Sequence, residues 1–347
     1  MTTLSDISAL VQAYPNPVLL IGRDERVVAA NGAAEVVIGP DLGGRHYISA
    51  LRQPDVLDAI EGAFLDGEMH GTRYLGQAGQ RDTTWKVTAA PVRLSAGRAV
   101  LLSFEDITAV EEAGQMRRDF VANVSHEMRT PLTALLGMVE TLRGPAKDDE
   151  GARDRFLGIM EREAGRMSHL VDDLLSLSRV EENERLKPVD EVNLSALVSE
   201  VVEVLQPVAA QAGLALRLTT PDAPVLVAGD EGQLRQVLNN LLENAIKYGT
   251  GGESVDVGLS GPDHDASLRT VDVRLSVRDH GEGIASHHIA RLTERFYRID
   301  AHRSREVGGT GLGLAIVKHI VNRHRGRLRI ESELGEGSRF SVVLPVE

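Results

Sequence analysis

The chain has 347 residues, 42% of them apolar and 26% charged, a composition typical of a soluble globular protein with two or three domains. Its formal net charge of −13 argues against nucleic acid as a partner, because nucleic-acid binding needs a basic surface. The absence of cysteine excludes disulfides, cysteine-ligated metals and thiol redox chemistry. No window reaches the roughly 20 apolar residues of a transmembrane helix, so we expect a cytoplasmic protein without an integral membrane segment.

Residues 1–107 predict a small α+β domain in which two strands are followed by short helices and then by three more strands. The expected strands are 18–21, 26–30, 72–76, 84–91 and 98–105, and the expected helices are 31–38 and 54–65. This order resembles the PAS fold, and the exit Asp106-Ile107-Thr108 resembles the junction through which PAS domains lead into a signalling helix.

Residues 108–185 predict a hairpin of two long helices. Apolar residues recur at spacings of three and four in both halves, and Arg143-Gly144-Pro145 interrupts the pattern between them. Two helices cannot bury both apolar stripes by themselves. We therefore expect a homodimer in which two hairpins form a four-helix bundle.

Residues 190–347 alternate amphipathic helices with strands and predict an α/β sandwich. The expected helices are 194–212, 231–248, 286–296 and 312–325. The expected strands are 214–219, 224–228, 254–259, 270–279, 327–332 and 338–344.

The first helix of the hairpin carries Ser125-His126-Glu127 and, shortly after, Thr130-Pro131. A neutral imidazole offers a free ring nitrogen, which makes His126 a candidate nucleophile for phosphoryl transfer. Attack through Nε2 makes the Nδ1 proton more acidic, so a carboxylate that holds or takes this proton assists. Thr130 lies four residues after His126 and therefore on the same helix face. The string is not a zinc-protease motif, since Thr130 stands where a second histidine would be needed.

A second group of candidates lies on the predicted helix 231–248. Asn240, Asn244, Lys247 and Tyr248 recur at intervals that place them on one face. The amide oxygens of Asn240 and Asn244 suit Mg²⁺, which takes few protein ligands and completes its shell with water and phosphate oxygens. Lys247 supplies a cation for phosphate charge, and the Tyr248 ring is expected to pack against a base.

The string Asp279-His280-Gly281-Glu282-Gly283-Ile284 follows a predicted strand. A carboxylate at a strand end accepts a hydrogen bond from the 6-amino group of adenine, which the 6-oxo group of guanine cannot donate. Asp279 therefore predicts a preference for ATP. Gly281 and Gly283 are expected to let the backbone approach the base. Ile284, which follows them, is also predicted to bind the nucleotide.

A glycine-rich string, Gly309-Thr310-Gly311-Leu312-Gly313, opens the predicted helix 312–325. Backbone N–H groups at a helix N-terminus favour anions, so this string predicts the triphosphate site.

Taken in this order, the His126 string and the nucleotide-binding strings resemble the sensor histidine kinases of two-component systems, with the phosphate-regulon sensor kinases nearest in overall likeness and with no transmembrane helix. The resemblance implies a multidomain α+β protein: a PAS-like domain (1–107), a dimeric four-helix-bundle hairpin (108–185) and a catalytic α/β sandwich of the Bergerat type (190–347). It implies Mg²⁺ and ATP as cofactors, His126 as the phosphoacceptor, Glu127 as the base, and a response regulator of the phosphate-regulon type as partner. It also gives Thr130 a role in dephosphorylating that regulator, and Arg298 a place in a lid over the phosphates.

Two other functions stay open at this point. One is a nucleotide-binding scaffold or phosphatase without kinase activity, which transfer of ³²P from ATP would distinguish. The other is a free ATPase. ATPases of the gyrase and Hsp90 type place a catalytic glutamate four residues before the magnesium-binding asparagine, where it activates water. Here that position is Asn240, which disfavours a free ATPase and favours transfer of the γ-phosphate to a protein nucleophile.

Overall fold

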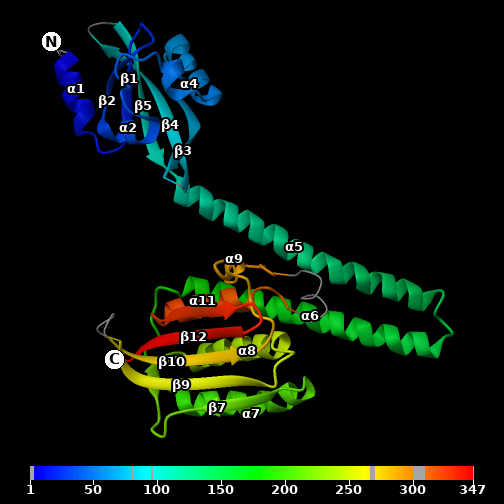
Figure 1. Ribbon diagram of the computed structural model, residues 1–347. Helices are drawn as coiled ribbons and strands as arrows, with labels where there is room; N and C mark the ends of the chain where they lie inside the picture. The colour runs from blue at the N-terminus through cyan, green and yellow to red at the C-terminus, as the bar shows by residue number, and fades with distance from the viewer. Residues whose placement is uncertain (1–3, 80, 95–96, 266–269, 300–308, 347) are drawn as a thin grey trace. The chain divides into compact units, whose positions relative to one another are not determined.

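A computed structural model describes residues 4–79, 81–94, 97–265, 270–299 and 309–346. The chain divides into two compact units, Met1–Ala122 and Asn123–Glu347. The helix α5 (Thr108–Arg143) belongs partly to each of them, and the two units are described separately (Figure 1).

The first unit is built on an antiparallel five-stranded sheet with the strand order β2-β1-β5-β4-β3. Its strands are β1 (Val18–Ile21), β2 (Val27–Ala30), β3 (His70–Ala78), β4 (Arg81–Leu94) and β5 (Gly97–Asp106). Its helices before α5 are α1 (Leu4–Ala13), α2 (Gly32–Ile38), α3 (Tyr47–Leu51) and α4 (Pro54–Asp66). All five strands and the helices α2 and α4 match the sequence predictions, whereas α1 and α3 were not predicted.

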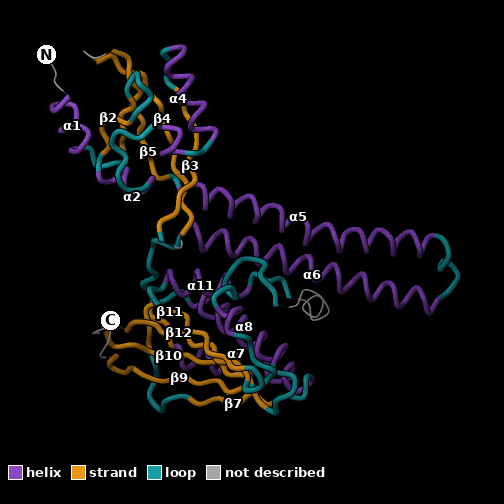
Figure 2. The backbone as a smooth tube through the Cα atoms, turned by 45° about the horizontal axis from the view of Figure 1, so that its top comes forward, coloured by secondary structure: helices purple, strands orange, loops and turns teal. Residues whose placement is uncertain are grey.

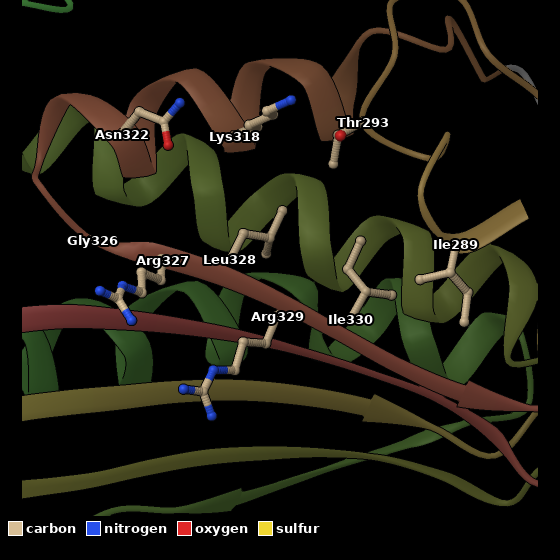
Figure 3. Close-up of a pocket in the computed structure, with 9 residues that line it drawn as sticks. All are labelled: Ile289, Thr293, Lys318, Asn322, Gly326, Arg327, Leu328, Arg329 and Ile330. Carbon is tan, nitrogen blue, oxygen red and sulfur yellow. The ribbon is translucent and has the colours of Figure 1, made fainter. Parts of the chain in front are cut away.

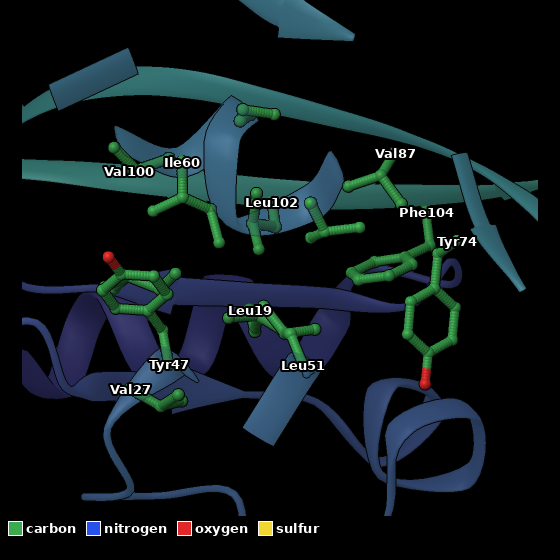
Figure 4. Packing of buried hydrophobic residues seen from close by; sticks show 14 of the residues in the cluster. Leu19, Val27, Tyr47, Leu51, Ile60, Tyr74, Val87, Val100, Leu102 and Phe104 are labelled. Atoms are coloured by element: carbon green, nitrogen blue, oxygen red, sulfur yellow. The ribbon is translucent and has the colours of Figure 1, made fainter. Parts of the chain in front are cut away.

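Both faces of this sheet are covered, which the strand β1 illustrates. Alternate side chains of a strand point to opposite faces, and all four residues of β1 are buried. Leu19 and Ile21 belong to the larger apolar core, which Figure 4 shows with Tyr47, Ile60 and Phe104. Val18 and Leu20 belong to a smaller core on the other face, together with Val11 of α1. The unpredicted helix α1 therefore closes the second face.

The second unit begins with the helical hairpin, in which α6 (Glu150–Glu182) returns alongside the end of α5 (Figure 2). Asp149 caps α6, since its carboxylate accepts a hydrogen bond from the Ala152 N–H. The predicted break lies where α5 ends, at Arg143.

The rest of the second unit is a two-layer sandwich. Its sheet has the order β11-β12-β10-β9-β7, in which β7 and β9 run parallel and the other pairs are antiparallel. The strands are β7 (Ala215–Thr219), β9 (Ser254–Asp265), β10 (Thr270–Asp279), β11 (Arg327–Glu333) and β12 (Gly337–Val346). The helices α7 (Leu194–Gln211), α8 (Glu231–Tyr248) and α11 (Gly313–Arg323) pack against β7, β10 and β11 respectively. A separate ribbon pairs β6 (Glu191–Asn193) with β8 (Leu226–Ala228).

One predicted helix of this unit was wrong. The pattern at 286–296 predicted eleven helical residues, but α9 spans only Ser286–Ile289, and turns follow it. Phe296 has a φ of 63°, in the left-handed region, which no continuing α-helix allows. Its backbone N–H donates to the Gly311 carbonyl at 2.8 Å, so a contact far along the chain replaces the helical hydrogen bond.

Candidate active site

His126 lies on an exposed face of α5. Together with Arg129, Thr130, Thr133 and Ala134 it lines a surface hollow of about 460 Å³. The Thr130 hydroxyl donates to the His126 carbonyl oxygen at 3.2 Å, which holds Thr130 on the same face. The imidazole is thus accessible from solvent, as a residue that receives and passes on a group must be.

Glu127, the neighbour of His126, is held between two arginines. The Arg166 guanidinium of α6 lies 3.3 Å from its carboxylate, and that of Arg298 lies 3.4 Å away. Glu127 is only partly buried, but the Arg298 side chain is 9% exposed. Arg298 also donates to the Gly309 carbonyl. Glu127 thus contacts Arg166 within the hairpin and Arg298 of the segment expected to form the lid, and Arg298 in turn contacts the glycine-rich string.

The helix α8 carries all four residues predicted on it, which are Asn240, Asn244, Lys247 and Tyr248. Its apolar face is buried against the sheet, which leaves the polar positions toward the opposite side. The Asn240 amide nitrogen donates to the Gln236 carbonyl at 3.0 Å. Its oxygen points at Gly313, where an added Cβ would lie 2.5 Å away. The asparagine oxygen and the glycine-rich string are therefore adjacent, and an amide oxygen in this place is a ligand type that Mg²⁺ accepts. Lys247 lies 3.4 Å from Glu243, and Tyr248 is 43% exposed.

Asp279, at the end of β10, is almost completely buried, with 4% exposure. Its Oδ1 accepts hydrogen bonds from the Gly281 N–H at 3.0 Å and from the Ser338 N–H at 3.2 Å. Burial raises the pKa of the carboxyl, and these backbone hydrogen bonds oppose the rise. Among the described residues, both bonds go to one oxygen, so the other is available to accept from a ligand.

The glycines after Asp279 lie against neighbouring backbone. A Cβ on Gly281 would come within 2.3 Å of the Tyr248 carbonyl oxygen, and one on Gly283 would overlap the Glu333 carbonyl. Gly281 thus makes room for the end of α8, and Gly283 for the end of β11. The Ile284 N–H is held by the Ser332 hydroxyl at 2.8 Å.

In the glycine-rich string, Thr310 makes a contact that sequence reasoning missed. Its hydroxyl donates to the carboxylate of Asp173, on α6, at 2.7 Å. Burial raises the pKa of Asp173, and the bond from Thr310 opposes that shift. Leu312 is buried and precedes α11, whose first residue is Gly313. Residues 300–308, which include the rest of the expected lid, lie outside the described residues.

Comparison with known proteins places both halves of this site in families. The His Kinase A (phospho-acceptor) domain matches residues 116–183, and the histidine kinase-, DNA gyrase B- and HSP90-like ATPase matches residues 229–347. The chain is 41% identical over 251 residues to the phosphate regulon sensor protein PhoR of Pseudomonas aeruginosa. It is 40% identical over 231 residues to the sensor-like histidine kinase SenX3 of Mycolicibacterium smegmatis.

The chain belongs to the sensor histidine kinases. The alignments cover 72% and 66% of this histidine kinase, but only 55% and 57% of the two relatives. It therefore spans little more than half the length of each. The solved histidine kinase ThkA in complex with response regulator protein TrrA shares the fold at a TM-score of 0.51 and 22% identity, over 98% of both chains. Within its described residues, this kinase has no helix long and apolar enough to cross a membrane.

Proposed function

We propose that the protein is an ATP-dependent protein-histidine kinase that phosphorylates its own His126 and passes the phosphoryl group to an aspartate of a response regulator. The observation that carries this proposal is the arrangement around Glu127. The carboxylate next to the exposed His126 is 3.4 Å from Arg298, which also contacts the glycine-rich string. In-line transfer requires the nucleophile to be held close to the phosphate. Contacts that connect the neighbour of His126 to the proposed phosphate-binding loop support such an arrangement.

ATP would be the substrate and Mg²⁺ the charge-neutralising cofactor. Asp279 would accept a hydrogen bond from the adenine amino group, and Asn240 and Asn244 would offer their amide oxygens to the metal. Lys247, Tyr248 and residues 309–313 would complete the nucleotide site. The His126 nitrogen would form the new bond to the γ-phosphorus while the bond to the bridging oxygen breaks. Glu127 would hold the imidazole proton, and the two arginines beside it would fix its position.

Exposed apolar side chains of the hairpin support a homodimer. On α5, Leu132 is 49% and Leu136 58% exposed, and on α6 Leu157 and Leu175 are similarly exposed. Such a surface is usually covered by a partner, and a second hairpin would complete a four-helix bundle. The strand order of the first unit supports the PAS-like assignment of residues 1–107. Thr130, on the His126 face, would serve in dephosphorylating the regulator.

The test is incubation of the purified protein with Mg²⁺ and γ-³²P-ATP. Label that is acid-labile and alkali-stable, and absent from His126→Gln, is the expected result. Glu127→Gln should slow labelling by roughly 10²- to 10⁴-fold, the usual contribution of a general base, with ATP affinity retained. ATP binding without any label on the wild-type chain would overturn the proposal and leave a scaffold or phosphatase. Phosphate release without phosphoprotein would favour a free ATPase instead.

A further inference from the structure

The short helix α9 and the turns that follow it contain a compact cluster of polar rings. The Nδ1 of His288 lies 2.6 Å from the Tyr297 hydroxyl. The Arg291 guanidinium lies over the Tyr297 ring, 4.2 Å from its centroid. The ring centroids of His287 and His288 are 3.9 Å apart. The Tyr297 side chain is thus fixed twice, at its hydroxyl by an imidazole and at its face by a cation.

Tyr297 stands between two residues that reach the proposed transfer site. Phe296, before it, donates its N–H to the Gly311 carbonyl from a left-handed backbone conformation. Arg298, after it, contacts the Gly309 carbonyl and the Glu127 carboxylate. A left-handed non-glycine residue persists only where its surroundings hold it. Anchoring Tyr297 therefore supports both the Phe296 conformation and the direction of Arg298.

The surroundings of the cluster favour an uncharged His288. Burial lowers its pKa first, and the neighbouring His287 and Arg291 lower it further. Glu294 lies nearby, but it pairs with Arg291 at 3.3 Å. In the strand β11, on which α9 packs, the partly buried residues are Leu328, Ile330 and Ser332, and they alternate with exposed charged residues.

Figure 3 shows the cavity of about 470 Å³ beside this segment. Ile289 and Thr293 form one wall and Leu328 and Ile330 lie below, while α11 contributes the cation Lys318. The charged residues that line this cavity are all basic. Among the described residues that line this cavity, none carries a negative charge that would favour a protonated His288.

We infer that neutral His288 is a positioning residue for phosphoryl transfer, which acts through Tyr297 to direct Arg298 toward Glu127 and the glycine-rich string. This inference rests on the proposed kinase function. With Nδ1 unprotonated, the imidazole accepts a hydrogen bond from the Tyr297 hydroxyl. Protonation of Nδ1 reverses this bond, so that Nδ1–H donates to the hydroxyl oxygen, and it places a new cation against His287 and Arg291. Repulsion between this cation and Arg291, which lies over the Tyr297 ring, opposes the arrangement that positions Tyr297, so the positioning effect declines as pH falls through the lowered pKa of His288.

The experiment compares autophosphorylation of the full chain at saturating Mg-ATP between about pH 5.5 and about pH 8. The readout is the rate of each variant divided by the wild-type rate at the same pH. Any pH dependence of the transfer step that the variants share with the wild type cancels in this ratio. Tyr297→Phe keeps the ring under Arg291 but removes the hydroxyl. His288→Gln keeps an acceptor oxygen but cannot titrate in this range. Melting temperatures of both variants verify folding.

Tyr297→Phe is expected to be about three- to tenfold slower than wild type near pH 8, the effect of one lost hydrogen bond. This difference should narrow toward about pH 5.5, where the positive charge on His288 beside Arg291 already weakens the wild-type arrangement. His288→Gln should match wild type at the upper end and exceed it at the lower. His287→Gln, a neighbouring control, should shift the wild-type transition to higher pH without abolishing it.

Labelled wild type with variant ratios that do not change with pH would overturn the role of His288 and leave the kinase function intact. A Tyr297→Phe rate equal to wild type at every pH would do the same. A wild type that takes no label at any pH would overturn the kinase function and this inference together.

Discussion

Asp279 and Asp106 end strands in different units of the molecule and make the same local turn. In each, Oδ1 accepts the N–H of the residue two positions on, from Gly281 at 3.0 Å and from Thr108 at 2.9 Å. Each carboxylate accepts a second bond, from the Ser338 N–H or from the Thr108 hydroxyl. Their pKa values nevertheless move in opposite directions, upward for Asp279 and downward for Asp106.

Burial accounts for the difference. Asp279 is 4% exposed, and the cost of burying its charge outweighs the hydrogen bonds it accepts. Asp106 is exposed, so the bonds from Thr108 dominate and favour its ionised form. The same aspartate turn therefore has a different role in each unit. At Asp106 the carboxylate ties the chain together, whereas at Asp279 the fold maintains an unfavourable carboxylate, as expected of a group kept for a ligand.

The largest effect expected from this contrast is on ATP affinity. Asp279→Asn keeps an oxygen for the Gly281 and Ser338 amides but places an NH₂ group where the adenine amino group would be accepted. We expect Mg-ATP binding, measured by calorimetry, to weaken roughly 10- to 100-fold, the range for a hydrogen bond to a charged group. Discrimination against GTP should fall as well.

Asp106→Asn makes the same chemical change in the equivalent turn and serves as the matched control. Its Mg-ATP affinity should equal that of the wild type. An Asp279→Asn protein that binds ATP as tightly as the wild type would remove Asp279 from the nucleotide site.

A second prediction concerns stability, and its sign follows from the raised pKa of Asp279. Between the ordinary pKa of an aspartate and this raised value, the folded chain binds more protons than the unfolded one. Its stability therefore declines as pH rises through that interval. Asp279→Asn removes this decline, so near neutral pH the variant should melt no lower than wild type, and its advantage should shrink on acidification. Thermal unfolding followed by circular dichroism at several pH values measures this. A variant that melts well below wild type at neutral pH would mean that the carboxylate is structural.

Much of this arrangement was accessible from the sequence. The predicted helix 231–248 and the predicted strand 270–279 have the observed bounds of α8 and β10. Their apolar periodicity is strong, and Asp230 caps the helix through the Gln233 N–H. The helix expected at 286–296 failed because Phe296 bonds to Gly311, a contact that no local pattern encodes. The three-residue strand β6 exists only through its pairing with β8.

In the candidate site, too, the contacts between residues far apart in the sequence could not be predicted. His126 and Asp279 stand in recognisable strings, and the string gives their chemistry. Arg166 and Asp173 are single charges among many on α6 and are indistinguishable from solvated surface residues in the sequence. Their partners Glu127 and Thr310 lie 39 and 137 residues away. Only the packing of α6 against the rest of the unit brings these pairs together.

The smallest expected effect concerns Asp106, the exposed aspartate of the comparison. In the first unit, the Thr108 hydroxyl that donates to Asp106 also accepts the Thr84 N–H at 2.9 Å, so this turn fastens the start of α5 to β4. Asp106→Ala removes the acceptor and should lower the stability of the protein by roughly 1 kcal/mol, or a few degrees in melting temperature. Because the pKa of Asp106 is lowered, its contribution is present above the ordinary aspartate pKa and is lost as pH falls through the lowered value. The deficit in melting temperature of Asp106→Ala relative to wild type should therefore shrink on acidification. For Asp279→Asn it is the gain in melting temperature over wild type that shrinks on acidification.

Since α5 leads on to His126, the Asp106→Ala variant should also change the rate of autophosphorylation while leaving ATP affinity unaltered. Unchanged stability and rate in Asp106→Ala would show that the shared turn matters only where it is buried.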